Sequence, residues 1–358
     1  MPVPWRCAVA ELTPRPAVLR MAPYSPPTGG RAGKLRLDFN ENTVGCSPRV
    51  IECLAKWLNA DRLTIYPEYV EARKEIAAFF GVAEDQLLLS NGTDEAIQVL
   101  INTYVDDDAE VLLLRPSYAM YRFYAELAGG AIRETNYHSG DLSFPLDELL
   151  AAITPSTRAI LIANPNNPTG TAVSLDAIER ILTRASNAAV LIDEAYFEFC
   201  GITALPLVAR YSNLFVSRTF SKVYGMAAMR MGCVFSQARN VAYMHKAQSP
   251  YSVNMLAAVA ARAAIRDPDY VRRYVDEALA ARQMICDGFG AMQIDYFPSQ
   301  ANFVLFRAGD RAIEIRDKLR AKGVLIRDRS YELPGCVRVT VGTREQAQRF
   351  LGALKEIW

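Results

Sequence analysis

The sequence contains very little histidine and no paired-cysteine motif. Only His138 and His245 occur among its 358 residues, and neither stands in an HExxH spacing. The seven cysteines form no CxxC pair, and their odd number argues against a complete disulfide framework. Two histidines leave almost no residues for a histidine-based zinc site or a Ser-His-Asp triad, so we predict no metal site. The cysteine pattern predicts free thiols in a reducing cytoplasm.

The sequence also lacks a surplus of charge and any long apolar run. Its 40 Lys and Arg residues face 39 Asp and Glu residues, which leaves a net charge of +1. No overall field draws such a chain to nucleic acid or to an anionic membrane. No run approaches the length of a membrane span, and the N-terminal stretch lacks the apolar core of a secretory leader. We therefore expect a cytoplasmic protein with a small-molecule substrate, and neither a nucleic acid nor a membrane as its partner.

Short apolar runs alternate with helical patterns through most of the chain. This rhythm is typical of an α/β fold, with a mostly parallel sheet of seven strands and helices on both of its faces. The expected strands are 87–89, 110–114, 131–136, 159–163, 190–192, 214–216 and 231–235. Ligands of such sheets bind beyond the carboxyl ends of the strands, where we therefore look for chemistry.

The chain is longer than one ordinary core, so we expect two domains and an arm. Residues 1–46 are predicted to be an extended N-terminal arm, because they are rich in Pro and Gly up to about residue 35. Residues 47–255 are predicted to form the large domain. Residues 256–358 are predicted to form a smaller α+β C-terminal domain, whose first long helix is interrupted at Pro268.

Lys222 and Asp193 are the main chemical candidates, since each follows an expected strand. An isolated lysine is most often a surface charge, but the apolar neighbours of Lys222 would remove water from its amine and favour a nucleophile. Ser221 and Arg230 nearby suit an anionic phosphate. An isolated Asp at a strand end is more often a helix cap. If buried, however, Asp193 needs a cationic or donor partner, such as the protonated nitrogen of a pyridine ring.

Two further loops follow expected strands. The loop 163–170 is stiffened by prolines and would hold the Asn167 amide as a fixed donor, although it could be a simple connection. In the segment 90–96 a helix is expected from Asp94, and Gly92 permits close backbone approach to an anion. Ordinary helix capping explains this segment taken alone. In one sheet with Lys222 and Arg230, it predicts a phosphate cup.

Together these motifs resemble the fold type I pyridoxal-phosphate (PLP) enzymes of aminotransferase class I/II, most closely the histidinol-phosphate aminotransferase branch, over about residues 35–358. The resemblance implies that Lys222 binds PLP as a Schiff base, that Asp193 keeps its ring nitrogen protonated, and that Asn167 and Tyr196 contact its phenolic oxygen. We take Lys222, Asp193 and Tyr196 as catalytic. Further implied cofactor residues are Gly92, Thr93, Asp94, Tyr118, Thr219, Ser221, Arg230 and, across a homodimer interface, Tyr66.

The resemblance also implies the substrate and its contacts. Arg338, which alternates with apolar residues on a strand, would bind the substrate carboxylate with Asn167, and Arg327 would be a second anion reader; an exposed strand arginine is the alternative. The implied reaction is transamination between histidinol phosphate and 2-oxoglutarate. Many relatives place a phosphate-binding tyrosine where Val44 stands. Val44 cannot donate a hydrogen bond, so Tyr24 of the arm is the alternative donor.

Other functions remain open at this point. An aromatic or broad-range L-amino-acid aminotransferase would share every cofactor residue, and a threonine-phosphate decarboxylase would look nearly the same. A nicotinamide dehydrogenase is disfavoured because no GxGxxG opens a helix after an expected strand. A PLP-dependent regulator is disfavoured because no helix-turn-helix module precedes the arm.

Overall fold

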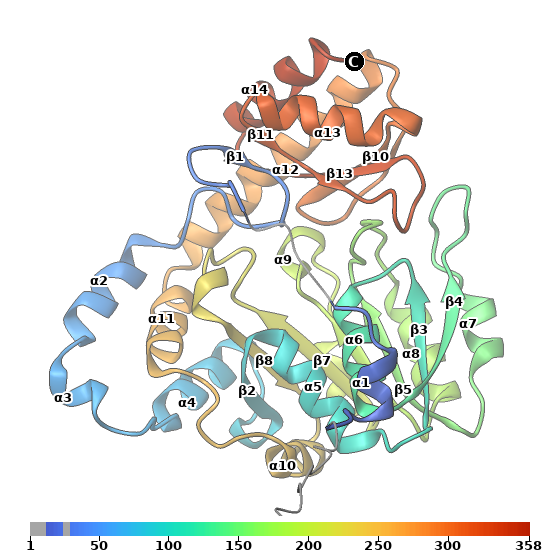
Figure 1. Cartoon of the computed structure of the whole chain (residues 1–358). Helices are drawn as coiled ribbons and strands as arrows, with labels where there is room; N and C mark the ends of the chain where they lie inside the picture. Colours follow the sequence, from blue (N-terminus) through green and yellow to red (C-terminus); the bar gives the residue numbers. More distant parts are fainter. Residues whose placement is uncertain (1–11, 24–28) are drawn as a thin grey trace, which may run out of the picture.

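A seven-stranded sheet forms the centre of the structure, a computed structural model that describes residues 12–23 and 29–358. The strand order is β2-β8-β7-β6-β5-β3-β4, and only β8 runs antiparallel to its neighbours (Figure 1). The predicted α/β fold with a mostly parallel sheet is confirmed. Its strands are β2 (Leu87–Asn91), β3 (Glu110–Arg115), β4 (Ala131–Asn136), β5 (Thr157–Ala163), β6 (Ala189–Asp193), β7 (Leu214–Thr219) and β8 (Met231–Phe235).

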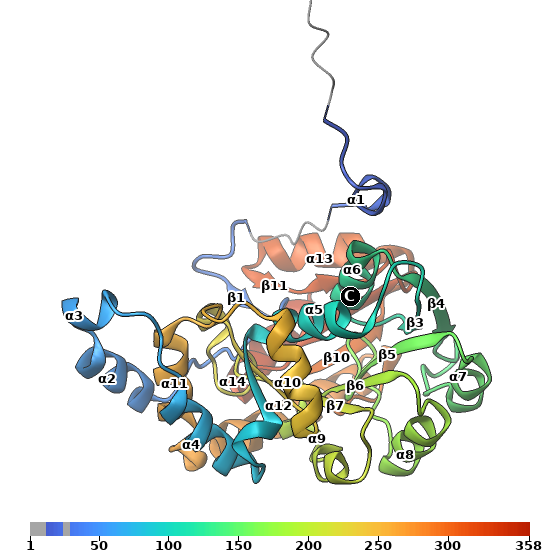
Figure 2. The same ribbon diagram turned by 90° about the horizontal axis from the view of Figure 1, so that it is seen from below.

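Helices cover both faces of this sheet, as Figures 1 and 2 show. Successive strand residues point to opposite faces, so Leu161 of β5 joins one core while Ile160 and Ile162 join the other. The first core is closed by α5 (Gly92–Tyr104), α6 (Ala119–Ala128) and α10 (Ala238–Ala247). The second core is closed by α4 (Val70–Phe80), α7 (Leu146–Ala152), α8 (Leu175–Arg184) and α11 (Met255–Ile265).

A smaller antiparallel sheet lies above the carboxyl ends of the large one in Figure 1. Its order is β12-β13-β10-β9, and α12 (Pro268–Ala291) leads into it. The expected helix break at Pro268 is confirmed, because α11 ends at Ile265 and α12 begins with that proline. The remaining elements of this part are β9 (Tyr296–Phe297), β10 (Phe303–Arg307), α13 (Ala312–Ala321), β12 (Arg327–Asp328), β13 (Cys336–Thr340) and α14 (Arg344–Lys355). The domain boundaries at residues 46 and 255 stay predictions.

The N-terminal segment connects the two sheets. β1 (Leu35–Arg36) pairs in parallel with β11 (Val324–Leu325), so residues 38–41 run along the boundary between the sheets. The expectation of no folded element before residue 35 is wrong for α1 (Pro16–Arg20), where Pro16 supplies the backbone angle that a first helical turn needs. After this segment come α2 (Pro48–Trp57) and α3 (Ala60–Leu63), which project from the body in Figure 1.

Candidate active site

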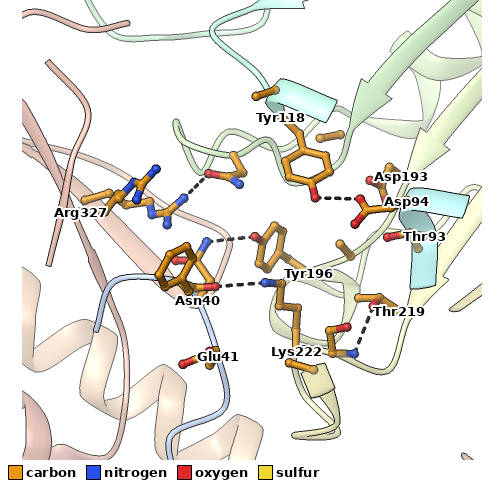
Figure 3. Close-up of a pocket in the computed structure, with 18 of the residues that line it drawn as sticks. Asn40, Glu41, Thr93, Asp94, Tyr118, Asp193, Tyr196, Thr219, Lys222 and Arg327 are labelled. Carbon is orange, nitrogen blue, oxygen red and sulfur yellow. Dashed lines mark hydrogen bonds between the residues drawn. The ribbon is translucent and has the colours of Figure 1, made fainter. Parts of the chain in front are cut away.

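The loops after the parallel strands meet in one cavity of about 310 Å³, which the smaller sheet closes from the other side. Figure 3 shows its side chains. The structure thus brings together most of the sequence-predicted site residues, at the edge of the sheet where α/β folds bind ligands. Those that line the cavity are Thr93, Asp94, Tyr118, Asn167, Asp193, Tyr196, Thr219, Ser221, Lys222, Arg230, Arg327 and Arg338.

Lys222 lies in the connection between β7 and β8, and its side chain points into the cavity (Figure 3). Its Nζ donates a hydrogen bond of 3.1 Å to the carbonyl oxygen of Phe39. The same Nζ lies 5.8 Å from the centre of the Tyr196 ring, whose hydroxyl accepts a 2.9 Å bond from Asn40 Nδ2. The amine is therefore held in place by groups from the N-terminal segment and from the loop after β6. An amine so positioned can act as a nucleophile.

Asp193 ends β6 and is 4% exposed. Ser217 Oγ donates a 2.8 Å hydrogen bond to its Oδ1, and the Tyr121 hydroxyl donates a 2.8 Å bond to its Oδ2. Burial raises the pKa of Asp193, although both hydrogen bonds oppose this shift. A buried carboxylate of this kind is suited to a cationic partner in the cavity. Ser217 and Tyr121 were not predicted as site residues.

An anion cup lies at the start of α5. This helix begins at Gly92, two residues before the expected Asp94, and Gly92 adopts a positive φ of 72° at the turn from β2. A Cβ at Gly92 would stand 2.4 Å from the Arg230 guanidinium, so the glycine lets that side chain approach the helix N-terminus. Arg230 Nη2 bonds to Asp94 at 3.1 Å, and the Tyr118 hydroxyl also donates to Asp94 at 2.8 Å.

Ser221 and Thr219 complete this side of the cavity. Arg230 Nη1 donates to Ser221 Oγ at 3.4 Å, and the backbone N–H of Ser221 donates to Thr219 Oγ1 at 3.1 Å. The cup thus gathers a guanidinium, hydroxyls and the N-terminal N–H groups of α5, which are the groups that bind phosphate in proteins.

Arg338 on β13 points into the opposite side of the cavity. It is 4% exposed, so the alternative of an exposed strand arginine is wrong: the packing of the two sheets covers both faces of β13 here. Its guanidinium donates to Asn167 Oδ1 and, at 2.8 Å, to the carbonyl oxygen of Asp38. Burial, together with repulsion from Arg329, lowers the pKa of Arg338 to about 10, which leaves it a cation at neutral pH.

Two sequence-identified positions lie away from the cavity. Tyr66 is 73% exposed, and its ring lies against that of Tyr251 at 4.6 Å between centroids. Val44 is 56% exposed and does not line the cavity, because its N–H bonds to Asn42 Oδ1 in a tight turn. Tyr24, the alternative phosphate donor, lies outside the described residues.

The N-terminal segment supplies cavity residues that sequence reasoning missed, namely Arg31, Phe39, Asn40 and Glu41. Arg329, which directly follows β12, was missed as well. The available signal was the run of acidic and amide residues between Asp38 and Asn42, which directly follows the alternating Leu35 and Leu37. Among residues 12–23 and 29–358, no cluster of three or more His, Cys, Asp or Glu residues is placed to hold a metal ion. No helix of the described ranges is long and apolar enough to cross a membrane.

Comparisons with known proteins agree with this geometry. The family model of aminotransferase class I and II matches residues 32–354. The chain is 35% identical to the histidinol-phosphate aminotransferase of Geobacillus sp. (strain WCH70), with 90% of each chain covered. It is also 35% identical to the protein of that name from Symbiobacterium thermophilum, with 95% of this chain and 97% of the relative covered. The chain therefore belongs to the aminotransferase class I and II family.

Solved structures share the fold. The histidinol-phosphate aminotransferase of Sinorhizobium meliloti, solved in complex with pyridoxal 5′-phosphate, aligns with a TM-score of 0.86 at 24% identity and covers 98% of both chains. A histidinol-phosphate aminotransferase-like protein from Erwinia carotovora aligns with a TM-score of 0.85 at 25% identity, over 90% of this chain and 96% of its own.

The residues of the cavity fit pyridoxal phosphate. The cofactor has a phosphate, a ring nitrogen that ionises and an aldehyde. The structure offers the cup formed by Gly92 and Arg230 for the phosphate, the buried carboxylate of Asp193 for the ring nitrogen and the amine of Lys222 for the aldehyde. The predicted enzyme class, an aminotransferase that uses this cofactor, is thus confirmed.

Proposed function

We propose that this enzyme transfers the amino group of histidinol phosphate to a 2-oxo acid, with 2-oxoglutarate as the acceptor. One observation carries the proposal: a single cavity holds Lys222, the buried Asp193 and the phosphate cup at one end, and Arg338 with Asn167 at the other. The relatives named histidinol-phosphate aminotransferase support the choice of donor. We also propose a cytoplasmic location, because the six cysteines of the described residues are all free.

We assign roles as follows. Lys222 Nζ would hold the cofactor covalently, Asp193 would pair with its ring nitrogen, and Arg230 with the start of α5 would hold its phosphate. Bound there, the cofactor supplies an electron sink for the bond at the substrate Cα. Lys222 Nζ, once free, takes the Cα proton, since it is the amine that reaches into the cavity beside Tyr196. Arg338 and Asn167 orient the anionic end of the substrate.

Replacing the proposed base tests these roles. Lys222→Ala removes the amine, so the purified protein loses its visible absorption band and kcat falls by about 10²–10⁴-fold. Absorption spectra and steady-state rates measure the two effects. A matched control is Lys246→Ala on α10, which lies outside the cavity and keeps both. A visible band that survives in Lys222→Ala contradicts the assignment.

The amino donor is tested by the half-reaction without acceptor. Histidinol phosphate should bleach the cofactor, while phenylalanine, tyrosine and leucine should act more slowly. If histidinol phosphate fails and the aromatic acids succeed, the enzyme is an aromatic or broad-range aminotransferase. Release of carbon dioxide from threonine phosphate marks the decarboxylase instead.

We also infer that the active form is a homodimer in which Tyr66 reaches the phosphate cup of the partner subunit. Tyr66 belongs to an exposed apolar face, and solvent exposure of so many large apolar side chains is unusual for a surface without a partner. The members of this face, on and around α2 and α3, are Ile51, Leu58, Leu63, Ile65, Tyr66, Val70 and Tyr251.

A further inference from the structure

Three arginines line one side of the cavity, and only two of them were predicted. Arg327 on β12 lies directly opposite Arg338 on β13. Arg329 follows two residues after Arg327, and its backbone N–H donates to the Cys336 carbonyl oxygen at 2.9 Å, so it stays alongside β13. Residues two apart on a strand point to the same face. We call Arg327, Arg329 and Arg338 the arginine cluster.

Each member of the arginine cluster has a buried nitrogen without a hydrogen-bond partner among the described residues. These atoms are Arg327 Nη1, Arg329 Nε and Arg338 Nε. Arg329 is only 7% exposed and Arg338 only 4% exposed, so water is largely excluded from their guanidinium groups. A buried donor without a partner costs free energy, so the protein leaves hydrogen-bonding capacity of these arginines unused.

Arg31, which also lines this cavity, differs from the arginine cluster in this respect. Its guanidinium donates to both carboxylate oxygens of Asp38, at 3.1 and 2.8 Å, and to both of Glu41, at 3.1 and 2.7 Å. Its hydrogen-bonding capacity is therefore used within the protein. Arg31 holds the N-terminal segment together, and anion recognition is left to the arginine cluster.

The charge balance around the arginine cluster is positive. Glu332 pairs with Arg329 and offsets one of the three positive charges. Asp38, close by, shares Arg31 with Glu41, which also lies 3.7 Å from Arg36, and Asp328 lies 3.8 Å from Arg316. The three arginines and Glu332, taken by themselves, leave two positive charges on this wall of the cavity. Repulsion among these arginines, with Arg329 the strongest charged neighbour, contributes to the lowered pKa of Arg338.

We propose that Arg329 is a specificity-determining residue, which acts with Arg327 and Arg338 to select amines that carry a phosphate monoester over amines that carry a single carboxylate. This proposal rests on the proposed function, and it identifies the anionic group of the substrate that this cavity recognises. A carboxylate has two oxygens and one charge, which the Arg338 fork can satisfy alone. A phosphate monoester has three free oxygens and two charges at neutral pH, and it therefore uses the additional donor of Arg329.

The test compares two donors in the half-reaction of the holoenzyme, histidinol phosphate and phenylalanine. Arg329→Gln should lower the specificity constant for histidinol phosphate by about tenfold or more and that for phenylalanine by less than about threefold. Arg329→Lys keeps the charge and should recover part of the loss. Glu332→Gln removes the opposing charge, so it should raise the ratio of the two constants. Arg349→Gln, a matched change on α14 outside the cavity, should leave the ratio unchanged.

Equal losses for both donors in Arg329→Gln, or the same loss in Glu332→Gln, would overturn the proposal, because a structural ion pair fails when either partner is removed. Calorimetric titration of the wild-type and Arg329→Gln holoenzymes with inorganic phosphate tests the role of Arg329 independently of the proposed amino donor. If histidinol phosphate does not bleach the wild-type cofactor, the proposed donor is wrong. Weaker phosphate binding in Arg329→Gln, by about tenfold, still supports the proposal, and unchanged binding refutes it.

Discussion

Glu198 is a carboxylate that the active site does not use. It follows β6 in α9 (Phe197–Cys200) and lines a second cavity with Arg218. Burial raises the pKa of Glu198 to about 7, although the Arg218 guanidinium opposes the shift. That guanidinium is already paired with Glu194. Glu198 is therefore protonated in the folded protein at a pH where it ionises in the unfolded chain.

This difference predicts a pH dependence of stability. The folded protein holds a proton that the unfolded chain releases between about pH 4.5 and 7, so this group lowers the free energy of unfolding as the pH rises through that window. Glu198→Gln removes the effect. Denaturant unfolding should therefore show the variant to be more stable than the wild type at pH 8 and equally stable at pH 4.5. A constant difference across the whole range would contradict the assigned pKa.

Among single residues, the sequence predicts those whose charged side chain is uncommon at the position where it stands. Lys222 and Asp193 were predicted because each is a charged residue at or after the carboxyl end of a strand, where α/β sheets bind their ligands. Tyr121 was missed, since an aromatic residue in a helix looks like core packing until Asp193 is placed beside it. Arg329 was missed because its neighbours in sequence are also charged, and only the fold buries it.

The junction of β8 with the start of α5 is the element that shapes the proposed phosphate cup. Gly92 and Gly232 face each other there: a Cβ at Gly92 would meet the flexible Arg230 side chain, whereas a Cβ at Gly232 would meet the backbone of Gly92 at 2.7 Å. A side chain can move, but a backbone in a sheet cannot move cheaply. The two glycines should therefore respond differently to the same substitution.

We predict that Gly92→Ala still folds but binds the cofactor about tenfold or more weakly, because Arg230 is displaced and the positive φ is strained. Gly232→Ala should lower the melting temperature of the cofactor-free protein by several degrees, since it separates α5 from β8. Cofactor titration and thermal unfolding of both variants measure the difference. If both variants had the melting temperature and the cofactor affinity of the wild type, the close approach of Gly92 and Gly232 would have no role in folding or cofactor binding.

The positions of the strands could be predicted because buried strands are continuous apolar runs. β4 and β8 have the expected ends, but β7 runs to Thr219 and not to residue 216. Ser217, Arg218 and Thr219 are polar, and hydrophobicity alone cannot include them in a strand. Ser217 and Arg218 can be buried because Asp193, at the end of β6, and Glu194, directly after it, supply their partners.

At the scale of the whole molecule, the proposed homodimer predicts complementation. A Lys222→Ala subunit lacks the base, and a Tyr66→Ala subunit lacks the tyrosine that it gives to its partner. In a mixed dimer, the Tyr66→Ala subunit keeps its own Lys222 and receives Tyr66 from the Lys222→Ala subunit. Mixing the two weakly active variants and allowing the subunits to exchange should thus restore about half of the wild-type activity per hybrid dimer.

Steady-state rates after mixing, with each variant alone as the control, measure this effect. If Tyr66 acted within its own subunit, the hybrids would recover nothing. The sequence could suggest this arrangement only through the family resemblance, because nothing local distinguishes a tyrosine used by a partner from an exposed one. The closeness of Arg31 and Phe39 to Arg327 was likewise not predictable, since almost 300 residues separate them along the chain.

The pairing of β1 with β11 has a mechanical consequence. Leu35 and Leu37 donate to carbonyl oxygens of Gly323 and Leu325, and Leu37 also accepts from Thr340, so this short stretch is fastened to the smaller sheet. Phe39, whose carbonyl oxygen accepts a hydrogen bond from Lys222 Nζ, stands two residues after Leu37. A rigid displacement of the smaller sheet would therefore move the arginine cluster and the N-terminal segment away from the cavity together. The same movement would break the hydrogen bond that holds Lys222.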